Sequence, residues 1–439
     1  MKRSVSRDAI IQMPIHALKH SMKTRDLALE EVYDAYQDHI ARCNPVINAY
    51  TQTSSQEMSP DVHEGPLSGI PVAIKDIFDV LGYETTAGSS FFRRMPKQDA
   101  FAVSLLRQQG CVVLGKTNTH EFAMGGTTIN PHFGTTKNPW DLNRVAGGSS
   151  GGSAAAIAAG LSLIALGSDT AGSIRIPAAF CGVVGLKPTY DQIPCHGVVP
   201  LSWSLDHVGF LTRSVVDMRE TWAAVFPDKN TVPKLPPLMR IGVILDHLDT
   251  DLEPAIEAAM TFVLDQMSSW NVEMIQIAFP LWHDSLASAF VISRVEAATY
   301  HQQWLESHAD KYGDDVRILL DVGRQFMGTD YVQSQRLRAE VITAYQRLFE
   351  TVDFVITPTV SVLPPLINNP PDRSVLTQLT APANLAGVPA ISVPIWNDSS
   401  LPIGLQIMAP WGQESALLTF AQQIEDHISA PRLSSCCLT

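Results

Sequence analysis

Short apolar runs of strand length alternate along this chain with segments of helical periodicity. Apolar runs occur at Ile70–Lys75, Cys111–Gly115 and Leu161–Leu166. Helical patterns occur at Asp99–Gln109 and at Gly151–Ala159, and a glycine directly follows each of them. Helices that alternate with short buried strands are typical of proteins built on an α/β sheet. The alternation therefore predicts an α/β fold.

The rest of the chain extends the pattern. One helical segment is predicted at Ala17–Cys43, before a turn-rich linker at Ser59–Pro66. Further strands are predicted at Arg240–Leu245, Val272–Ala278, Asp353–Thr357, Ala390–Pro394 and Ile403–Met408, and further helices at Leu252–Met267, Ser285–Ser307, Tyr331–Phe349 and Glu414–Ile428. Pro-rich segments at Val232–Pro237 and Pro358–Pro371 bracket the two long helices. We expect residues 280–345 to form a helical wall of the substrate pocket.

Composition limits the classes of partner. The chain has 439 residues, of which 45% are hydrophobic and 17% charged, as in globular proteins. Its net charge of −13 repels phosphate backbones, so we expect no nucleic-acid partner. The longest apolar run, Ala154–Leu166, is shorter than the roughly 20 residues that span a bilayer, so we expect no membrane association. Six cysteines without zinc or disulfide spacing, and no signal-peptide pattern, predict a cytoplasmic location.

Two serine-containing loops carry the chemistry. The first is Gly147–Ser153, in which glycines flank Ser149 and Ser150 and permit backbone geometry that a Cβ atom would block. The second is Asp169–Arg175, which contains Ser173. Successive backbone N–H groups before Ser173 are able to converge on one point, as an oxyanion hole requires.

A lysine supplies the base that these loops lack. Serine is a poor nucleophile until a base takes its proton, yet neither loop contains a histidine or a Gly-x-Ser-x-Gly elbow. Lys75 closes the apolar run that begins at Ile70, and burial there lowers the pKa of its amine. A neutral amine accepts a proton, and Ser149 is suited to pass one from Ser173 to Lys75. The arrangement predicts a hydrolase.

Other motifs fail. The glycine-rich loop lacks the Gly-Lys-Ser/Thr ending of a phosphate loop and the spacing of a dinucleotide fingerprint. His120-Glu121 begins like a zinc-protease motif, but Met124 stands where the second histidine belongs. We therefore expect no metal site.

The motifs resemble those of the amidase signature family. The matching segments are Gly65–Asp76, Gly147–Ser153, Gly167–Ala179, Cys181–Thr189, Asn384–Pro389 and Pro402–Gln406. Since the series extends over about residues 27–428, the resemblance implies a single amidase domain over residues 1–439. The implied fold is a mixed central β-sheet covered by helices on both faces. A homodimer and the absence of a cofactor are also implied.

The resemblance further implies a Ser–cis-Ser–Lys triad. Ser173 is the implied acyl-enzyme nucleophile, Ser149 the bridging serine after a cis peptide bond, and Lys75 the base. The implied oxyanion hole consists of the backbone N–H groups of Thr170, Ala171, Gly172 and Ser173. Ser150 resembles a family serine that supports this network, and Asp169 and Arg175 resemble buried structural partners.

The expected activity is hydrolysis of the C–N bond of a linear small-molecule amide. Ala171 stands where the family commonly has glycine, as in some members with carbamoyl-type substrates. A carbamate or urea-type hydrolase, allophanate- or urethane-like, is therefore one alternative. A second is an amidotransferase A-type subunit; however, Leu376–Thr380 lacks the acid that such subunits carry there. A third is a catalytically silent binding protein. Pocket walls are expected from Phe122–Thr128, Trp203 and the helices of 280–345.

Overall fold

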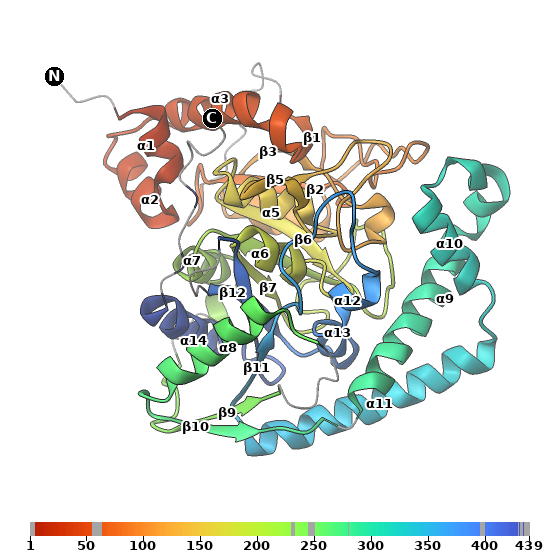
Figure 1. The fold of residues 1–439 in the computed structure, drawn as a ribbon. Helices are drawn as coiled ribbons and strands as arrows, with labels where there is room; N and C mark the ends of the chain where they lie inside the picture. The colour runs from red at the N-terminus through yellow and green to blue at the C-terminus, as the bar shows by residue number, and fades with distance from the viewer. Residues whose placement is uncertain are drawn as a thin grey trace.

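A mixed β-sheet of 11 strands forms the centre of the molecule (Figure 1). The computed structural model describes residues 5–54, 64–229, 233–244, 251–279, 281–395, 400–428, 430 and 433. The strands of this sheet are β1 (Tyr50–Thr53), β2 (Pro71–Lys75), β3 (Val112–Thr117), β6 (Ile164–Asp169), β7 (Val184–Lys187), β8 (His207–Thr212), β9 (Met239–Val243), β10 (Val272–Gln276), β11 (Phe354–Pro358), β12 (Ala390–Ile395) and β13 (Ile403–Met408). A second sheet pairs β4 (Lys137–Asn138) with β5 (Asp141–Val145).

The strands that carry the predicted site residues, β2 and β6, are neighbours within the sheet and are not edge strands. The order is β1-β3-β2-β6-β8-β7-β12-β13-β11-β9-β10. Strand β2 runs parallel to both β3 and β6, with Ile74 opposite Leu166, whereas β8 runs antiparallel to β6. Because parallel strands end at the same edge, the carboxyl ends of β2 and β6 lie side by side.

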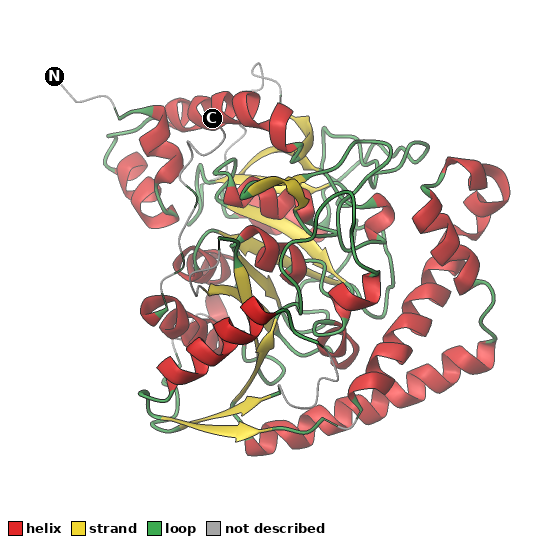
Figure 2. Ribbon diagram, viewed as in Figure 1, coloured by secondary structure: helices red, strands yellow, loops and turns green. Residues whose placement is uncertain are grey.

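Helices cover both faces of the sheet. They are α1 (Arg7–Gln12), α2 (Ile15–Lys23), α3 (Leu29–Ile47), α4 (Phe101–Gln108), α5 (Gly151–Ala158), α6 (Arg175–Cys181), α7 (Val215–Val225), α8 (Pro254–Met267), α9 (Trp282–His308), α10 (Asp314–Gly323), α11 (Gly328–Thr351), α12 (Arg373–Thr377), α13 (Ala381–Ala386) and α14 (Glu414–His427). Helices α5 and α6 pack together on one face, and α7 and α14 pack together on the other (Figure 2). The predicted α/β class is thereby confirmed.

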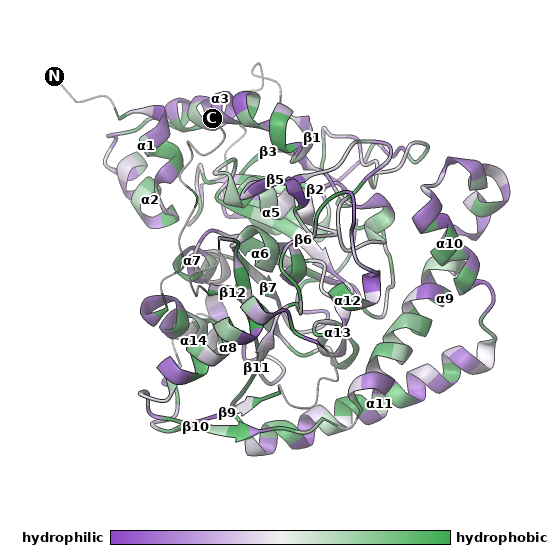
Figure 3. Ribbon diagram, in the orientation of Figure 1, coloured by the Kyte–Doolittle hydropathy of each residue, from purple (hydrophilic) through white to green (hydrophobic). Residues whose placement is uncertain are grey.

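The centre of the sheet is apolar and fully covered. Every residue of β2, β6, β8 and β13 is buried. Figure 3 shows hydrophobic colouring over much of the central sheet, whereas α11 alternates between hydrophilic and hydrophobic residues. Buried strands of this kind read as continuous apolar runs, which is why Ile70–Lys75 was recognisable in the sequence.

Several element boundaries differ from the sequence prediction. The helical segment at Ala17–Cys43 is two helices, α2 and α3, because the chain turns at Arg25, whose φ of 59° is incompatible with a right-handed helix. The strand expected from Leu161 begins at Ile164, since the Ser162 hydroxyl donates to the backbone oxygens of Pro71 and Ile164 and holds a bend. Residues 59–63 of the expected linker lie outside the described residues.

The long helices expected within 280–345 are present as one continuous layer. Helix α9 packs against α10, α11 and α13, and this layer curves along one side of the molecule (Figure 1). Close packing of α9 against α10 depends on Gly323, where a Cβ atom would lie 2.2 Å from the Arg294 carbonyl oxygen. Within the described residues, no helix combines the length and the apolar character needed to cross a membrane.

We predict that Gly323→Ala destabilises the protein, because the new methyl group forces α10 away from α9 at a backbone contact. Overpacking of this kind costs about 1–3 kcal/mol. Chemical denaturation of the purified variants measures this loss. Gly328→Ala is the matched control, since a Cβ atom there meets nothing within 4 Å and alanine has the better helix propensity. Equal stability of the two variants contradicts the prediction.

Candidate active site

Lys75 is buried at the carboxyl end of β2. Its carbonyl oxygen accepts hydrogen bonds from the N–H groups of Ile77 (2.8 Å) and Phe78 (3.1 Å), so the chain turns directly after it. The side chain is 0% exposed. Its Nζ atom donates to the hydroxyl of Ser149 at 2.7 Å and to that of Ser168 at 2.9 Å. The amine therefore lies between two neutral hydroxyl groups.

Burial controls the ionisation of this amine. Desolvation lowers the pKa of Lys75 to about 7, although the negative charges of Asp206 and Asp169 act in the opposite direction. Asp206 is itself buried, which raises the pKa of its carboxyl group to about 6. Near neutral pH, a substantial fraction of the Lys75 side chain is thus uncharged and able to accept a proton.

Ser149 lies on a tightly packed loop. The peptide bond between Gly148 and Ser149 is cis, as the family resemblance implies. The Ser149 carbonyl oxygen accepts hydrogen bonds from the hydroxyls of Thr119 (3.0 Å) and Thr128 (3.3 Å). A Cβ atom on Gly148 would approach the Thr127 nitrogen to 2.6 Å, so only glycine fits at this position. These contacts hold the Ser149 hydroxyl toward Lys75.

The second serine loop follows β6 and is tied to the first. The Ser150 N–H donates to the Ser173 carbonyl oxygen at 3.1 Å, and the Ser150 hydroxyl donates to the Ser168 carbonyl oxygen at 3.2 Å. Ser173 is 6% exposed, whereas Ser149 and Ser150 are 0% exposed. The structure therefore brings the three predicted serines and Lys75 to one edge of the sheet.

Ser168 is a site residue that the sequence analysis did not assign. It belongs to the quoted motif Gly167–Ala179, but the motif alone does not say which side chains face Lys75. The parallel register of β2 and β6, with Ile74 opposite Leu166, places Ser168 beside the end of β2. The sequence motif does not contain this pairing of strands, so Ser168 could not be assigned to the site from the sequence.

Asp169 and Arg175 shape the loop that holds Ser173. Asp169 accepts hydrogen bonds from the Gly172 N–H (2.7 Å) and from the Arg175 guanidinium (2.9 Å). Both side chains of the ion pair are 0% exposed. Burial alone would raise the pKa of Asp169, but the charge and hydrogen bonds of Arg175 hold it below its ordinary value. The loop conformation thus depends on a buried ion pair.

The expected oxyanion-hole donors are not equivalent. The Gly172 N–H is engaged by Asp169, whereas among the described residues the N–H groups of Thr170, Ala171 and Ser173 have no acceptor. The Thr170 hydroxyl donates to Asp206 at 2.6 Å, and the Thr380 hydroxyl donates to the Ala171 carbonyl oxygen at 2.6 Å. These bonds orient the loop, and three backbone donors remain available in it.

The histidine of the incomplete zinc motif has another role. His120 Nε2 lies 2.7 Å from Asp315 Oδ2, and the carboxylate of Glu121 accepts a hydrogen bond from the Gly313 N–H at 2.7 Å. The two residues thus connect their loop to the first turn of α10 and to Gly313, which directly precedes this helix. Across the described part of the chain, His, Cys, Asp and Glu side chains form no group of three or more that could hold a metal ion.

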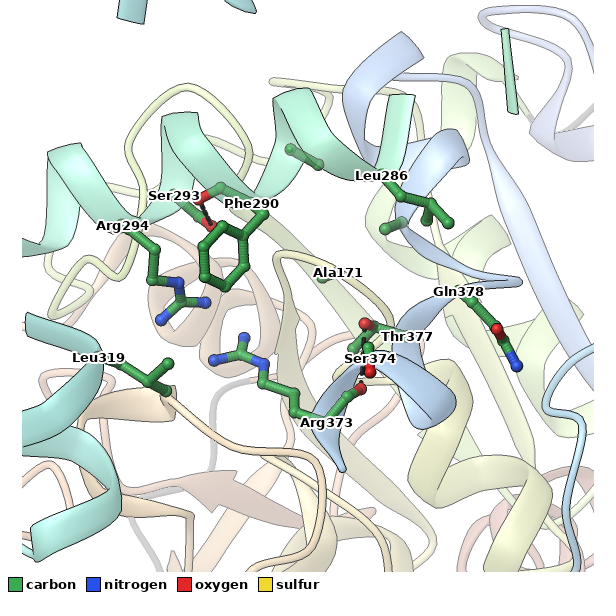
Figure 4. Close-up of a pocket in the computed structure, with 12 residues that line it drawn as sticks. Ala171, Leu286, Phe290, Ser293, Arg294, Leu319, Arg373, Ser374, Thr377 and Gln378 are labelled. Carbon is green, nitrogen blue, oxygen red and sulfur yellow. Dashed lines mark hydrogen bonds between the residues drawn. The ribbon is translucent and has the colours of Figure 1, made fainter. Parts of the chain in front are cut away.

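A cavity of about 290 Å³ adjoins the loop of Ser173 (Figure 4). Its lining comes from this loop, from α9 and α10, and from the α12–α13 region. The lining residues are Ala171, Leu286, Ala289, Phe290, Ser293, Arg294, Leu319, Arg373, Ser374, Thr377, Gln378 and Ala381. The long helix α9 thus contributes a wall of this cavity, whereas Phe122–Thr128 and Trp203 do not line it. The substrate-pocket wall expected from residues 280–345 stays a prediction.

Comparisons with known proteins identify the family. Residues 31–418 match the Amidase family. The A subunit of glutamyl-tRNA(Gln) amidotransferase from Synechococcus sp. (strain RCC307) is 34% identical, and the match covers 94% of this chain and 97% of that protein. A solved structure of an amidase has a TM-score of 0.88 and 30% identity, covering 95% of this chain and 100% of that chain.

A second solved structure is equally similar. It is a chain of a vestigial protein complex that bears on the evolutionary origins of an s-triazine catabolic enzyme. Its TM-score is 0.87 and its identity 30%, with 96% of this chain and 100% of that chain covered. The present chain therefore belongs to the amidase family.

We predict that Asp169→Asn destabilises the protein by about 3–5 kcal/mol near neutral pH, because it leaves the Arg175 charge buried without a partner. Urea denaturation measures this loss. Asp141→Asn, which removes one side of a partly exposed pair with Arg144, is the control and should change stability by about 0.5 kcal/mol or less.

The effect of Asp169→Asn should also depend on pH. Since the pKa of Asp169 is lowered in the folded state, its contribution is complete above the ordinary aspartate value of about 3.9 and is lost as the pH falls through the folded value. The difference between wild type and variant should therefore shrink in acid. A difference that grows in acid contradicts the assigned ion pair.

Proposed function

We propose that this amidase-family chain hydrolyses the C–N bond of a small linear amide through a serine acyl-enzyme. The observation that carries the proposal is the buried Lys75 amine, 2.7 Å from the Ser149 hydroxyl at the junction of the two serine loops. The continuous sheet from β1 to β10 supports a single domain over residues 1–439.

The first half of the reaction forms the acyl-enzyme. Ser173 Oγ attacks the amide carbonyl carbon while its proton passes to Ser149 and the Ser149 proton passes to the Lys75 amine. The carbonyl oxygen becomes an oxyanion that backbone N–H groups of the 170–173 loop stabilise. The C–N bond then breaks, and the proton held by Lys75 returns through Ser149 to the leaving amine.

The second half releases the acid. Water attacks the acyl carbon and gives its proton to the same relay, and Ser173 recovers its own proton as the ester bond breaks. Ser168 and Ser150 act as positioning residues. Ser168 holds the Lys75 amine at 2.9 Å, and Ser150 joins the two loops through its bond to the Ser173 carbonyl oxygen.

Two other activities are compatible with the same triad. The first is a carbamate or urea-type hydrolase, which Ala171 favours because some family members with carbamoyl-type substrates resemble this chain at that position. The glutamyl-tRNA(Gln) amidotransferase relatives make an A-type subunit the second alternative. Against the latter, Leu376–Thr380 contains no acidic side chain, and of these residues Thr377 and Gln378 line the cavity. A silent binding protein has no need of a lysine desolvated between two hydroxyls.

We predict that Ser173→Ala and Lys75→Met each reduce amide turnover by about 10³-fold or more, because the relay acts as a unit. Steady-state kinetics on matched amides, esters, carbamates and glutamine measure this loss, and a fluorophosphonate probe should label wild type but not Ser173→Ala. Ser162→Ala is the control, since its hydroxyl donates to the Pro71 and Ile164 carbonyl oxygens, at the opposite end of β6.

Each pattern of results selects one function. Faster turnover of carbamates than of matched amides supports the urea-type alternative. Ammonia release from glutamine that requires a co-purifying subunit supports the amidotransferase alternative. Undiminished turnover or labelling in Ser173→Ala contradicts the assigned nucleophile, and the absence of labelling in wild type supports a silent protein.

We predict that kcat/KM rises about tenfold per pH unit below pH 7 and becomes constant above it, because only the neutral Lys75 amine accepts a proton. In Asp206→Asn this rise should move to lower pH, since the Asp206 charge raises the pKa of Lys75 and asparagine removes it. Asp314→Asn, at an exposed position, is the control. An unshifted profile in Asp206→Asn contradicts the electrostatic assignment.

A further inference from the structure

Two arginines face one another in the cavity beside Ala171. Arg294 lies on α9 and is only 2% exposed, and Arg373 is the first residue of α12. Figure 4 shows the guanidinium groups of both side chains pointing into the same space from opposite sides. Two positive charges are thus concentrated in a small and mostly apolar cavity.

Neither arginine forms an ion pair within the described residues. The Nε and Nη1 atoms of Arg294 are buried and have no hydrogen-bond partner there. Its guanidinium lies 5.4 Å from the centre of the Phe290 ring, and Arg373 Nη1 donates to the Met124 carbonyl oxygen at 3.3 Å. A buried charge without a counter-charge is costly, so such groups normally have a partner.

Two acidic side chains of the elements around the cavity have partners elsewhere. Glu296, on the same helix as Arg294, accepts hydrogen bonds from the hydroxyls of Ser202 (2.6 Å) and Tyr331 (2.8 Å). Asp315, whose charge acts on Arg373, lies 2.7 Å from His120. Among the residues that the structure describes, no carboxylate pairs with either arginine, which points to a bound ligand as the source of the counter-charge.

The cavity is suited to a small substrate. Its volume of about 290 Å³ lies just below the range of roughly 300–1,000 Å³ that is typical of ligand pockets. Leu286, Phe290 and Leu319 supply apolar walls, and Ala171 connects the cavity to the loop that carries Ser173. A molecule that reaches from Ser173 to the arginines thus passes a short apolar region and ends in a positive one.

We propose that the substrate carries a carboxylate that Arg294 and Arg373 bind in this cavity while its amide carbonyl lies against the Ser173 loop. Planar guanidinium groups bind carboxylates through paired hydrogen bonds, which makes them selective for this group. The proposal rests on the proposed amide hydrolysis and names its substrate class, a short carboxylated amide. The carboxylate belongs either to the acyl part or to the amine part of that amide.

Binding tests the anion site without catalysis. Titration calorimetry with succinate is performed on full-length Ser173→Ala, alone and combined with Arg294→Gln or Arg373→Gln. We expect succinate to bind, and each arginine replacement to weaken binding at least tenfold. Arg324→Gln, an exposed arginine on the loop after α10, is the matched control and should bind as before. Binding of neutral succinamide as tight as succinate, or tighter binding of inorganic phosphate, overturns the proposal.

Thermal unfolding separates a binding role from a structural one. Because the two cations repel each other, replacing either one should not lower the Tm, and succinate should raise the Tm of Ser173→Ala but not of its arginine variants. Arg373→Gln keeps the test valid if Arg294→Gln fails to fold, since Arg373 is less deeply buried. A lowered Tm in Arg373→Gln, with succinate binding unchanged, assigns the arginine a structural role and overturns the proposal.

Kinetics identify which part of the substrate carries the charge. Succinamate has its carboxylate on the acyl part and N-acetylglycine on the amine part, and each is compared with its neutral methyl ester. For one of the two acids, we expect kcat/KM to be at least 100-fold higher than for its methyl ester. This acid-to-ester ratio should fall toward one in Arg294→Gln and Arg373→Gln. Ratios near one in wild type for both pairs overturn the proposal.

The two proposals fail in different ways. In one case the fluorophosphonate probe labels Ser173 and neutral amides are hydrolysed, but succinate binds equally well after either arginine is replaced. The proposed carboxylate site is then wrong, whereas the proposed amide hydrolysis stands. If succinate binding depends on the arginines but no amide is hydrolysed and Ser173 is not labelled, the anion site stands and the hydrolase is wrong.

Discussion

The proposed chemistry of this molecule depends on a lysine amine that is buried in contact with hydroxyl groups and with no carboxylate. A neighbouring lysine shows what this difference does. Lys116 on β3 is also 0% exposed, yet its amine lies 2.7 Å from the Asp76 carboxylate. Burial also lowers the pKa of Lys116, but there the charge and the hydrogen bond of Asp76 oppose the effect. Lys75 donates hydrogen bonds to Ser149 and Ser168 instead, and the charges of Asp206 and Asp169 oppose the effect of burial on its pKa without a hydrogen bond to the amine. Ion pairing makes one lysine structural, and its absence makes the other a candidate base.

A single polar network connects the loop that carries Ser173 to the sheet and to α13. Arg175 binds Asp169 and also donates to the side-chain oxygen of Asn384 at 2.6 Å. Asn384 in turn donates to the Asp169 carbonyl oxygen at 2.7 Å, and Gln406 on β13 accepts from Arg175. The loop before Ser173 is therefore held by α13 and β13, far along the chain, as well as by its own strand. This arrangement explains why motif segments that are distant in sequence belong to one site.

Two buried ion pairs neutralise their own charges, whereas the two cations in the cavity beside Ala171 do not. Asp169 pairs with Arg175, and Asp76 with Lys116. Arg294 and Arg373 have no such partner among the described residues, although Arg294 is nearly as deeply buried as the paired groups. Since leaving a buried charge unpaired is costly, an uncompensated pair beside a reactive loop is more typical of a ligand site than of a structural core.

The sequence by itself determined the α/β class, the strand that ends in Lys75, both serine loops and the residues that resemble a catalytic triad, because apolar periodicity and glycine-rich motifs are local signals. It could not show the break of the N-terminal helix at Arg25, which depends on one backbone conformation. It also did not assign Ser168, since strand periodicity says which face a residue occupies but not which strand lies beside it. Only the tertiary structure placed Arg294 opposite Arg373 and engaged the Gly172 N–H with Asp169. These features arise from contacts between segments that the chain brings together only when the whole sheet and its helices pack.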